Sequence, residues 1–252
     1  MIKSVLAAAL IVISMPVMAK SVDWTPYLKG MQDGCNLEDL YQNGVKKFAV
    51  DSDGDGVADY ESNDYDLLDL IGVGYGSYGM DQTAIKKAKK SNMPKVLQPS
   101  VAKYTTKKIG DYGARIDIHL KNAVAFGQPI TRIVYGSNHA GEVETYYTFT
   151  LYFANKDFSK IKSKFYVTIN GKKHFIGEKK KWELSDWKDS DSGMDDGDPV
   201  FTEIPFNTKS KSYSDGGAII SENSWRIISN SDIWEGGFLE FNTKNRSISC
   251  RS

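Results

Sequence analysis

The chain has 252 residues, and its 32 Lys and Arg residues balance 32 Asp and Glu residues to a formal net charge of zero. Charged residues make up 25% and hydrophobic residues 40% of the chain, which excludes collagen, a coiled coil and a wholly disordered tail. Zero net charge gives no global attraction to nucleic acid, so we expect no nucleic-acid partner. A mean hydropathy of -0.41 argues against many membrane spans.

Residues 1–19 have the layout of a secretory signal peptide. Lys3 gives a short basic start, residues 5–15 form an apolar run that is short for a bilayer, and Ala19 ends a small-residue cleavage site. An N-terminal anchor helix is the alternative. We therefore predict a protein exported to the periplasm or the extracellular space, and not an integral membrane protein.

The mature chain holds two cysteines, Cys35 and Cys250. In an oxidising compartment an even number of cysteines is typical of disulfide bonding. We predict a Cys35–Cys250 bridge that ties the first structured segment to the last predicted strand. Two unpaired thiols, or a bridge between two molecules, are the alternatives.

Residues 20–111 are expected to form an N-terminal region of short helices and loops. Trp24, Leu28 and Met31 recur with the spacing of a helix, and a second short helix is predicted over 37–44. A linker interrupted by prolines would follow.

From residue 112 onward the hydrophobic pattern changes to the period of a β-strand. Ile116 and Ile118 alternate with Asp117 and His119, as in a strand with one buried face. Several such segments follow, separated by turn residues. The predicted fold class is therefore mainly β (α+β): residues 112–252 form an antiparallel sheet, sandwich or open barrel, with a small helical N-terminal segment.

Two hairpins are predicted in this β region. The Asn-Gly pair at 170–171 supplies the two positive φ angles of a type I′ turn between strands at 164–169 and 172–176. A longer loop over 136–142 is expected to connect the strands of the other hairpin, and to contain His139.

Residues 51–62 carry the motif with the most definite chemistry. Carboxylates at loop positions 1, 3, 5 and 9, with glycine at position 6, are the layout of a calcium loop. This spacing lets alternate side chains of a curled loop converge on one ion that prefers oxygen ligands. The predicted ligands of Ca²⁺ are Asp51, Asp53, Asp55, Val57 through its carbonyl, Asp59 and Glu61.

Residues 51–59 resemble the aspartate-rich repeats of thrombospondin type 3 proteins and of bacterial envelope proteins, and also the first half of an EF-hand. The resemblance implies calcium binding and no particular activity. The segment departs from the EF-hand pattern at position 12, which is Ser62 where the pattern has an acid. A solvated acidic turn without metal is the alternative.

Charge is segregated along the chain. Residues 51–69 hold eight acidic residues and no basic one, whereas residues 82–110 hold eight lysines and no acidic residue. The basic tract suits an anionic surface such as phospholipid, lipopolysaccharide or a polyanionic glycan, although a solvated helix and linker would carry the same charges. The candidate surface-binding residues are Tyr75, Tyr78, Lys86, Lys87, Lys89 and Lys90.

The sequence contains no recognisable catalytic motif. Its three histidines lie in no zinc-binding spacing, and no G-x-S-x-G elbow occurs. Glu142 and Glu144 share a strand face, but charged solvent-facing strands are far commoner than catalytic carboxylate pairs. We therefore expect a soluble, non-enzymatic binding or structural protein, stabilised by calcium, whose partner is a protein or an anionic envelope component. The alternatives are a secreted hydrolase of glycan or peptide, and a secreted effector or inhibitor that docks a protein partner.

Overall fold

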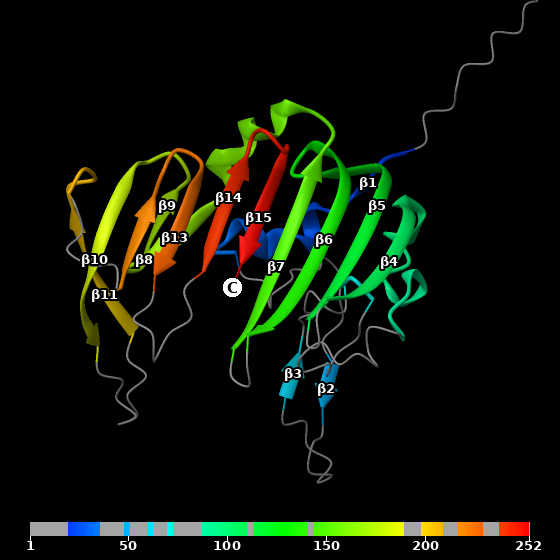
Figure 1. Ribbon diagram of the computed structural model, residues 1–252, viewed down its shortest axis with the longest axis horizontal. Coiled ribbons are helices and arrows are strands. Elements are labelled where there is room, and N and C mark those ends of the chain that lie inside the picture. The colour runs from blue at the N-terminus through cyan, green and yellow to red at the C-terminus, as the bar shows by residue number, and fades with distance from the viewer. Residues whose placement is uncertain are drawn as a thin grey trace, which may run out of the picture.

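The structure is a computed structural model that describes residues 20–35, 48–50, 60–62, 70–72, 87–109, 113–140, 144–188, 198–208, 216–228 and 237–251. Most of these residues lie in β-strands (Figure 1), which confirms the predicted mainly β class. In the described part of the chain, no helix is long and apolar enough to cross a membrane.

One open sheet of 11 strands dominates the fold, and it consists of two halves. The first half is a meander of β4 (Val101–Ile109), β5 (Gly113–Ala125), β6 (Gln128–Ala140) and β7 (Glu144–Phe153). The second half contains β10 (Lys180–Lys188), β11 (Asp198–Ile204), β12 (Gly217–Ile220), β13 (Ser224–Ile228), β14 (Phe238–Asn242) and β15 (Ser247–Arg251). The short strand β1 (Val22–Asp23) pairs with β5 in parallel, whereas the other described pairs of this sheet are antiparallel.

The two halves of the sheet meet where β15 pairs with β7. Cys250 lies opposite Phe149 and Ile248 opposite Leu151, and all four side chains are buried. Cys250 also forms the predicted disulfide with Cys35, 215 positions earlier in the chain. The seam between the two halves is therefore also the point at which the N-terminal segment is covalently attached.

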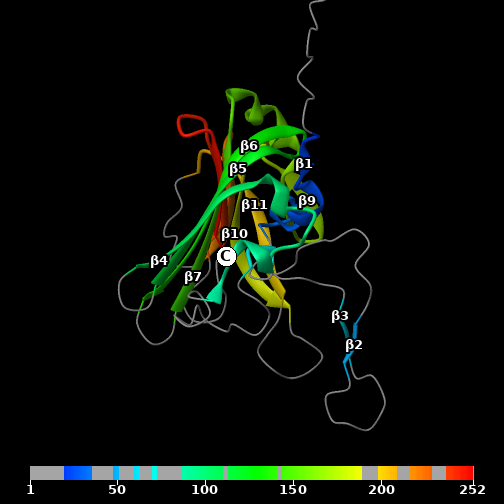
Figure 2. The same ribbon diagram turned by 90° about the vertical axis from the view of Figure 1, so that its right-hand side faces the viewer.

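A second layer covers one face of the sheet (Figures 1 and 2). Its members are the 3-10 helices η1 (Thr25–Tyr27), η2 (Lys29–Gln32) and η5 (Lys156–Lys164), and a hairpin of β8 (Tyr166–Ile169) and β9 (Lys172–Phe175). Two further 3-10 helices, η3 (Lys90–Asn92) and η4 (Gln98–Ser100), precede β4.

Aromatic side chains fill much of the space between the two layers. Phe158 of η5 stacks on Phe153 and Phe241, with ring centroids 4.9 and 6.0 Å apart. Phe165 meets Phe241 edge to face at 5.2 Å. Trp24, which the sequence places on a helical apolar face, is completely buried and donates through Nε1 to the Ser100 hydroxyl at 3.0 Å.

We call the face of the sheet on the side opposite this second layer the open face. On β5 the side chains of Ala114, Ile116 and Ile118 are buried against the second layer, so Asp117 and His119 belong to the open face. No described helix or strand crosses the open face, which is turned toward the viewer in Figure 1.

Three local expectations need correction. The 24–31 segment is helical, but it forms two 3-10 turns instead of one α-helix. Residues 101–109, expected in a linker and the basic tract, form β4, because Tyr104 and its threonine neighbours favour a strand in spite of the nearby lysines. His139 lies in β6 opposite Thr145 and not in a loop, since the hairpin of β6 and β7 continues through Ala140 and Glu144.

The hairpin at the Asn-Gly pair is confirmed, and its turn has a second role. Asn170 and Gly171 have φ angles of 49° and 73°, as a type I′ turn requires. The side-chain amide of Asn170 donates to the Phe201 carbonyl, and the Phe201 N–H donates to Asn170 Oδ1 at 3.0 Å. β11 is the edge of the sheet. Asn170 therefore occupies the Phe201 N–H and carbonyl, with which a further strand could otherwise pair.

We expect Asn170→Gly to keep the turn, since glycine readily adopts positive φ, and to lose both hydrogen bonds to Phe201. The free energy of unfolding should fall by about 1–2 kcal/mol, and the Phe201 amide should exchange faster with deuterium. Asn170→Asp is the matched control, because it keeps an acceptor for the Phe201 N–H. Equal protection of this amide in wild type and Asn170→Gly would contradict the covering role.

Candidate functional site

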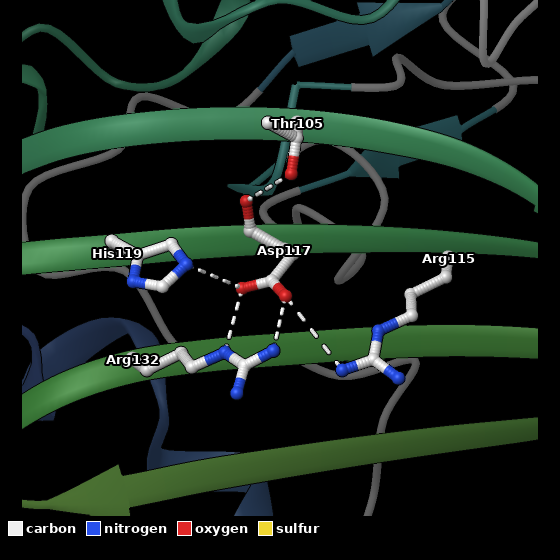
Figure 3. Close-up of polar contacts among 5 residues, drawn as sticks. All are labelled: Thr105, Arg115, Asp117, His119 and Arg132. Carbon is white, nitrogen blue, oxygen red and sulfur yellow. Dashed lines mark hydrogen bonds and ion pairs between the residues drawn. The ribbon is translucent and has the colours of Figure 1, made fainter.

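A carboxylate surrounded by basic side chains lies on the open face of the first half of the sheet (Figure 3). Arg132 on β6 binds Asp117 on β5 through two atoms: its Nε donates to Oδ1 at 2.7 Å, and its terminal nitrogen donates to Oδ2. Such a two-point bond fixes the plane of the guanidinium as well as its position.

Two more basic groups approach the same carboxylate from β5. The Arg115 guanidinium lies 3.6 Å from Asp117 Oδ2, and His119 Nε2 lies 3.4 Å from Oδ1. On the neighbouring edge strand, the Thr105 hydroxyl donates to the Asp117 backbone carbonyl at 3.4 Å. We call Arg115, Asp117, His119 and Arg132 the Asp117 cluster.

Strand geometry explains why these residues meet. Positions 115, 117 and 119 alternate with buried positions, so they share one face of β5. The register places Arg132 opposite both His119 and Tyr152 of β7. The Arg132 guanidinium also lies over the Tyr152 ring, 5.3 Å from its centroid, which holds its side chain from the other side.

The electrostatics of the cluster favour an ionised carboxylate and an anion beside it. The hydrogen bonds from Arg132 lower the pKa of Asp117, and the positive charges of Arg132, His119 and Arg115 act in the same direction. The Asp117 side chain is 17% exposed, whereas those of Arg132, Arg115 and His119 are 31%, 40% and 48% exposed. The carboxylate is therefore enclosed, and the basic groups around it reach solvent.

The surrounding open face is also basic. Three rows of side chains can be followed across the strands from the edge strand β4, and they contain six cationic residues against the carboxylates of Asp117 and Glu240. The cationic residues are Lys103, Lys107, Arg115, Arg132, Arg226 and Arg251. The Asp117 cluster is thus part of a positive surface on a chain that is neutral overall.

The predicted calcium ligands Asp51, Asp53, Asp55, Val57 and Asp59 lie outside the described residues. The segment that holds them is flanked by β2 (Phe48–Val50) and β3 (Tyr60–Ser62), which pair antiparallel with Val50 opposite Tyr60 and Ala49 opposite Glu61. Within the described ranges, no three His, Cys, Asp or Glu residues gather into a metal-binding group.

The predicted surface-binding residues are only partly described. Tyr75, Tyr78 and Lys86 lie outside the described ranges. Lys87 and Lys89 are exposed, whereas the Lys90 ammonium donates to the Val101 carbonyl at 2.9 Å. Two other lysines of the basic tract, Lys103 and Lys107, lie on the open face, because they stand opposite His119 and Arg115 in the pairing of β4 with β5.

His174 is a packing residue of the β8–β9 hairpin. It lies opposite Val167, its ring is 4.8 Å from that of Trp182, and its Nδ1 is 3.0 Å from a Glu178 carboxylate oxygen. Burial raises the pKa of Glu178, but the backbone hydrogen bond from Phe175 and the interactions with His174 and Lys180 together outweigh burial, so the pKa is lowered.

Arg115 and Arg132 are the residues that the sequence prediction missed. The alternation that exposed Asp117 and His119 also includes Arg115, but the arrival of Arg132 depends on the register between two strands. Comparisons with protein-family models, with curated proteins and with solved structures found no match for this chain. The chemistry of the open face is therefore the basis for assigning a function.

We expect Asp117→Asn to lower the free energy of unfolding at pH 7 by about 1–3 kcal/mol, because Arg132 loses a charged acceptor. The folded-state pKa of Asp117 is lowered, so its contribution is complete above the unfolded value of about 4 and is lost as the pH falls through the folded value. Urea titrations should show the gap between the two proteins narrowing from pH 7 toward pH 3.

Asp157→Asn is the matched control for this prediction. Asp157 pairs with Lys160 at 3.0 Å on an exposed turn of η5, and such surface pairs contribute at most about 1 kcal/mol. A cost for Asp117→Asn no larger than for Asp157→Asn would show that the cluster does not stabilise the sheet.

Proposed function

We propose that this is an exported binding protein that holds an anionic ligand on the open face of its sheet. The observation that carries the proposal is the convergence of Arg115, His119 and Arg132 on one enclosed carboxylate. This arrangement keeps three basic groups close together with reduced mutual repulsion, because Asp117 offsets part of their charge.

The chemistry of the basic groups favours carboxylate, sulfate or phosphate as the bound group. A guanidinium has five N–H donors in a plane and matches the geometry of these anions. Arg132 uses two of its nitrogens for Asp117, and the half-exposed Arg115 and His119 stand beside it. A ligand anion would complete a network that the protein has already oriented.

Binding fits the cluster better than acid–base catalysis. A general acid or base is most efficient when its pKa is near the working pH. The pKa of Asp117 is shifted the other way, below its ordinary value, by the hydrogen bonds from Arg132. Asp117 therefore suits the role of a permanent counter-charge that positions the arginine.

We also propose that Ca²⁺ stabilises the protein through residues 51–61. The pairing of β2 with β3 supports this, because it brings the two ends of the 51–59 segment together, as a loop that encircles an ion requires. The spacing of the four aspartates supplies hard oxygen ligands. This second proposal is independent of the open face.

For the open face, we expect wild-type protein to bind trigalacturonate at low ionic strength and Arg115→Gln to bind it about ten times more weakly. One charge-assisted hydrogen bond contributes about 1.5–3 kcal/mol, and added NaCl should weaken binding further. Isothermal titration calorimetry gives the affinities. Lys172→Gln, on the β8–β9 hairpin, is the matched control and should bind as wild type does.

For the calcium proposal, we expect EDTA to lower the melting temperature and millimolar Ca²⁺ to restore it, because an ion that binds only the folded state stabilises that state. The double substitution Asp53→Ala with Asp55→Ala should abolish the difference between Ca²⁺ and EDTA. Scanning calorimetry makes the comparison. Equal melting of the wild type in Ca²⁺ and in EDTA would contradict the proposal.

A further inference from the structure

The register of the sheet aligns basic residues from distant parts of the chain into one row. Starting at the β4 edge, each residue of the row lies directly opposite the next on the neighbouring strand, and paired residues share a face. This cross-strand row consists of Lys107, Arg115, Gly136, Thr148, Arg251, Phe238 and Arg226.

The cross-strand row is long and contains no acidic residue. Neighbouring strands are about 4.8 Å apart, so the six steps from Lys107 to Arg226 span about 29 Å. Lys107 and Arg226 lie at its two ends, and Arg115 and Arg251 lie between them. Arg226 is exposed and its guanidinium lies 5.9 Å from the centroid of the Phe238 ring, which orients it along the open face.

We propose that the cross-strand row binds a linear acidic polysaccharide that lies across the strands. The inference rests on the proposed function, and it adds the shape and class of the ligand. A small anion would be held by the Asp117 cluster alone, whereas Arg251 and Arg226 belong to the other half of the sheet. Only an extended ligand can contact both halves at once.

The row beside the cations favours a ligand with hydroxyl groups. This second row contains four residues with hydroxyl groups, together with Asp117 and Glu240. The four are Thr105, Thr150, Ser249 and Ser224. Thr150 and Ser249 lie 3.2 Å apart through their hydroxyl oxygens. Such groups both donate and accept hydrogen bonds, as sugar hydroxyls require, and the exposed Glu240 carboxylate can accept from sugar hydroxyls as well.

A polysaccharide fits this face better than a single-stranded nucleic acid. Proteins that bind single strands stack bases on aromatic rings. The aromatic residues of these rows, Tyr152 and Phe238, each lie beneath an arginine, so their faces are engaged by guanidinium groups. The sheet also twists from strand to strand, and a flexible polymer can follow the curved row where a planar membrane surface cannot.

The test compares two lengths of one acidic oligosaccharide. Wild-type protein should bind hexagalacturonate at least ten times more tightly than trigalacturonate, since the hexasaccharide can reach from the Asp117 cluster into the second half of the sheet. Arg226→Gln should abolish most of this gain and leave the trisaccharide affinity within twofold of wild type. Arg226→Lys keeps the charge and should keep the gain, and the methyl-esterified hexasaccharide, which lacks the charges, should not bind.

The outcomes separate this inference from the function on which it rests. Equal affinity for the two lengths, or a hexasaccharide affinity unchanged by Arg226→Gln, overturns the cross-strand row and leaves the Asp117 cluster as an anion site. Absence of trisaccharide binding overturns the proposed function itself. Tighter binding of an oligothymidylate than of hexagalacturonate overturns the polysaccharide. Circular dichroism of Arg226→Gln and Arg226→Lys verifies that both variants are folded.

Discussion

The pairing of β15 with β7 is the interaction on which the rest of the molecule depends. It joins the two antiparallel halves into one sheet, and it buries Ile248 and Cys250 beneath the second layer. Through the disulfide of Cys250, the same strand also anchors the N-terminal segment that contributes Trp24 and Leu28 to the core. Without this seam, β7 and β15 would each become an exposed edge.

The open face shows how a neutral chain can present a strongly charged surface. The covered face takes the apolar side chains of every second position, so the remaining positions are free to carry charge without loss of core packing. Asp117 holds Arg132 in one orientation and reduces the repulsion among its basic neighbours. Asp117 therefore orders the arginine but reduces the positive charge of the cluster, so local stability and affinity for an anion make opposite demands on this position.

Local patterns predicted the local features of this fold. The alternation around Ile116 and Ile118 identified β5 and the face of Asp117, and the Asn-Gly pair identified a turn whose conformation depends on two adjacent residues. The two cysteines sufficed for the disulfide, because a pair of thiols has only one intramolecular partner arrangement. In each case the information lies within a few residues or in a simple count.

Features that depend on register could not be predicted in the same way. Arg226 and Arg251 lie on either side of Phe238 because β14 pairs with β13 on one side and with β15 on the other, each in a fixed register. A register shift of one residue would turn these arginines to the other face of the sheet. Similarly, the lysines of β4 obscured a strand whose pairing with β5 is decided by Tyr104 and its neighbours. The proposed site is a property of the pairing, and the sequence of any one strand contains only a part of it.

The position of β15 in the chain has a consequence for the timing of folding. The hydroxyl of Ser249 on β15 contacts that of Thr150 on β7, although the two residues lie 99 positions apart in the chain. β15 also follows every other described strand in the chain. Contacts at such separation require loop closure before they bring any gain, so they form late. The first meander can assemble while the rest of the chain is still being synthesised, but the seam, its disulfide and the full span of the basic row need residues 247–251 and are therefore completed last.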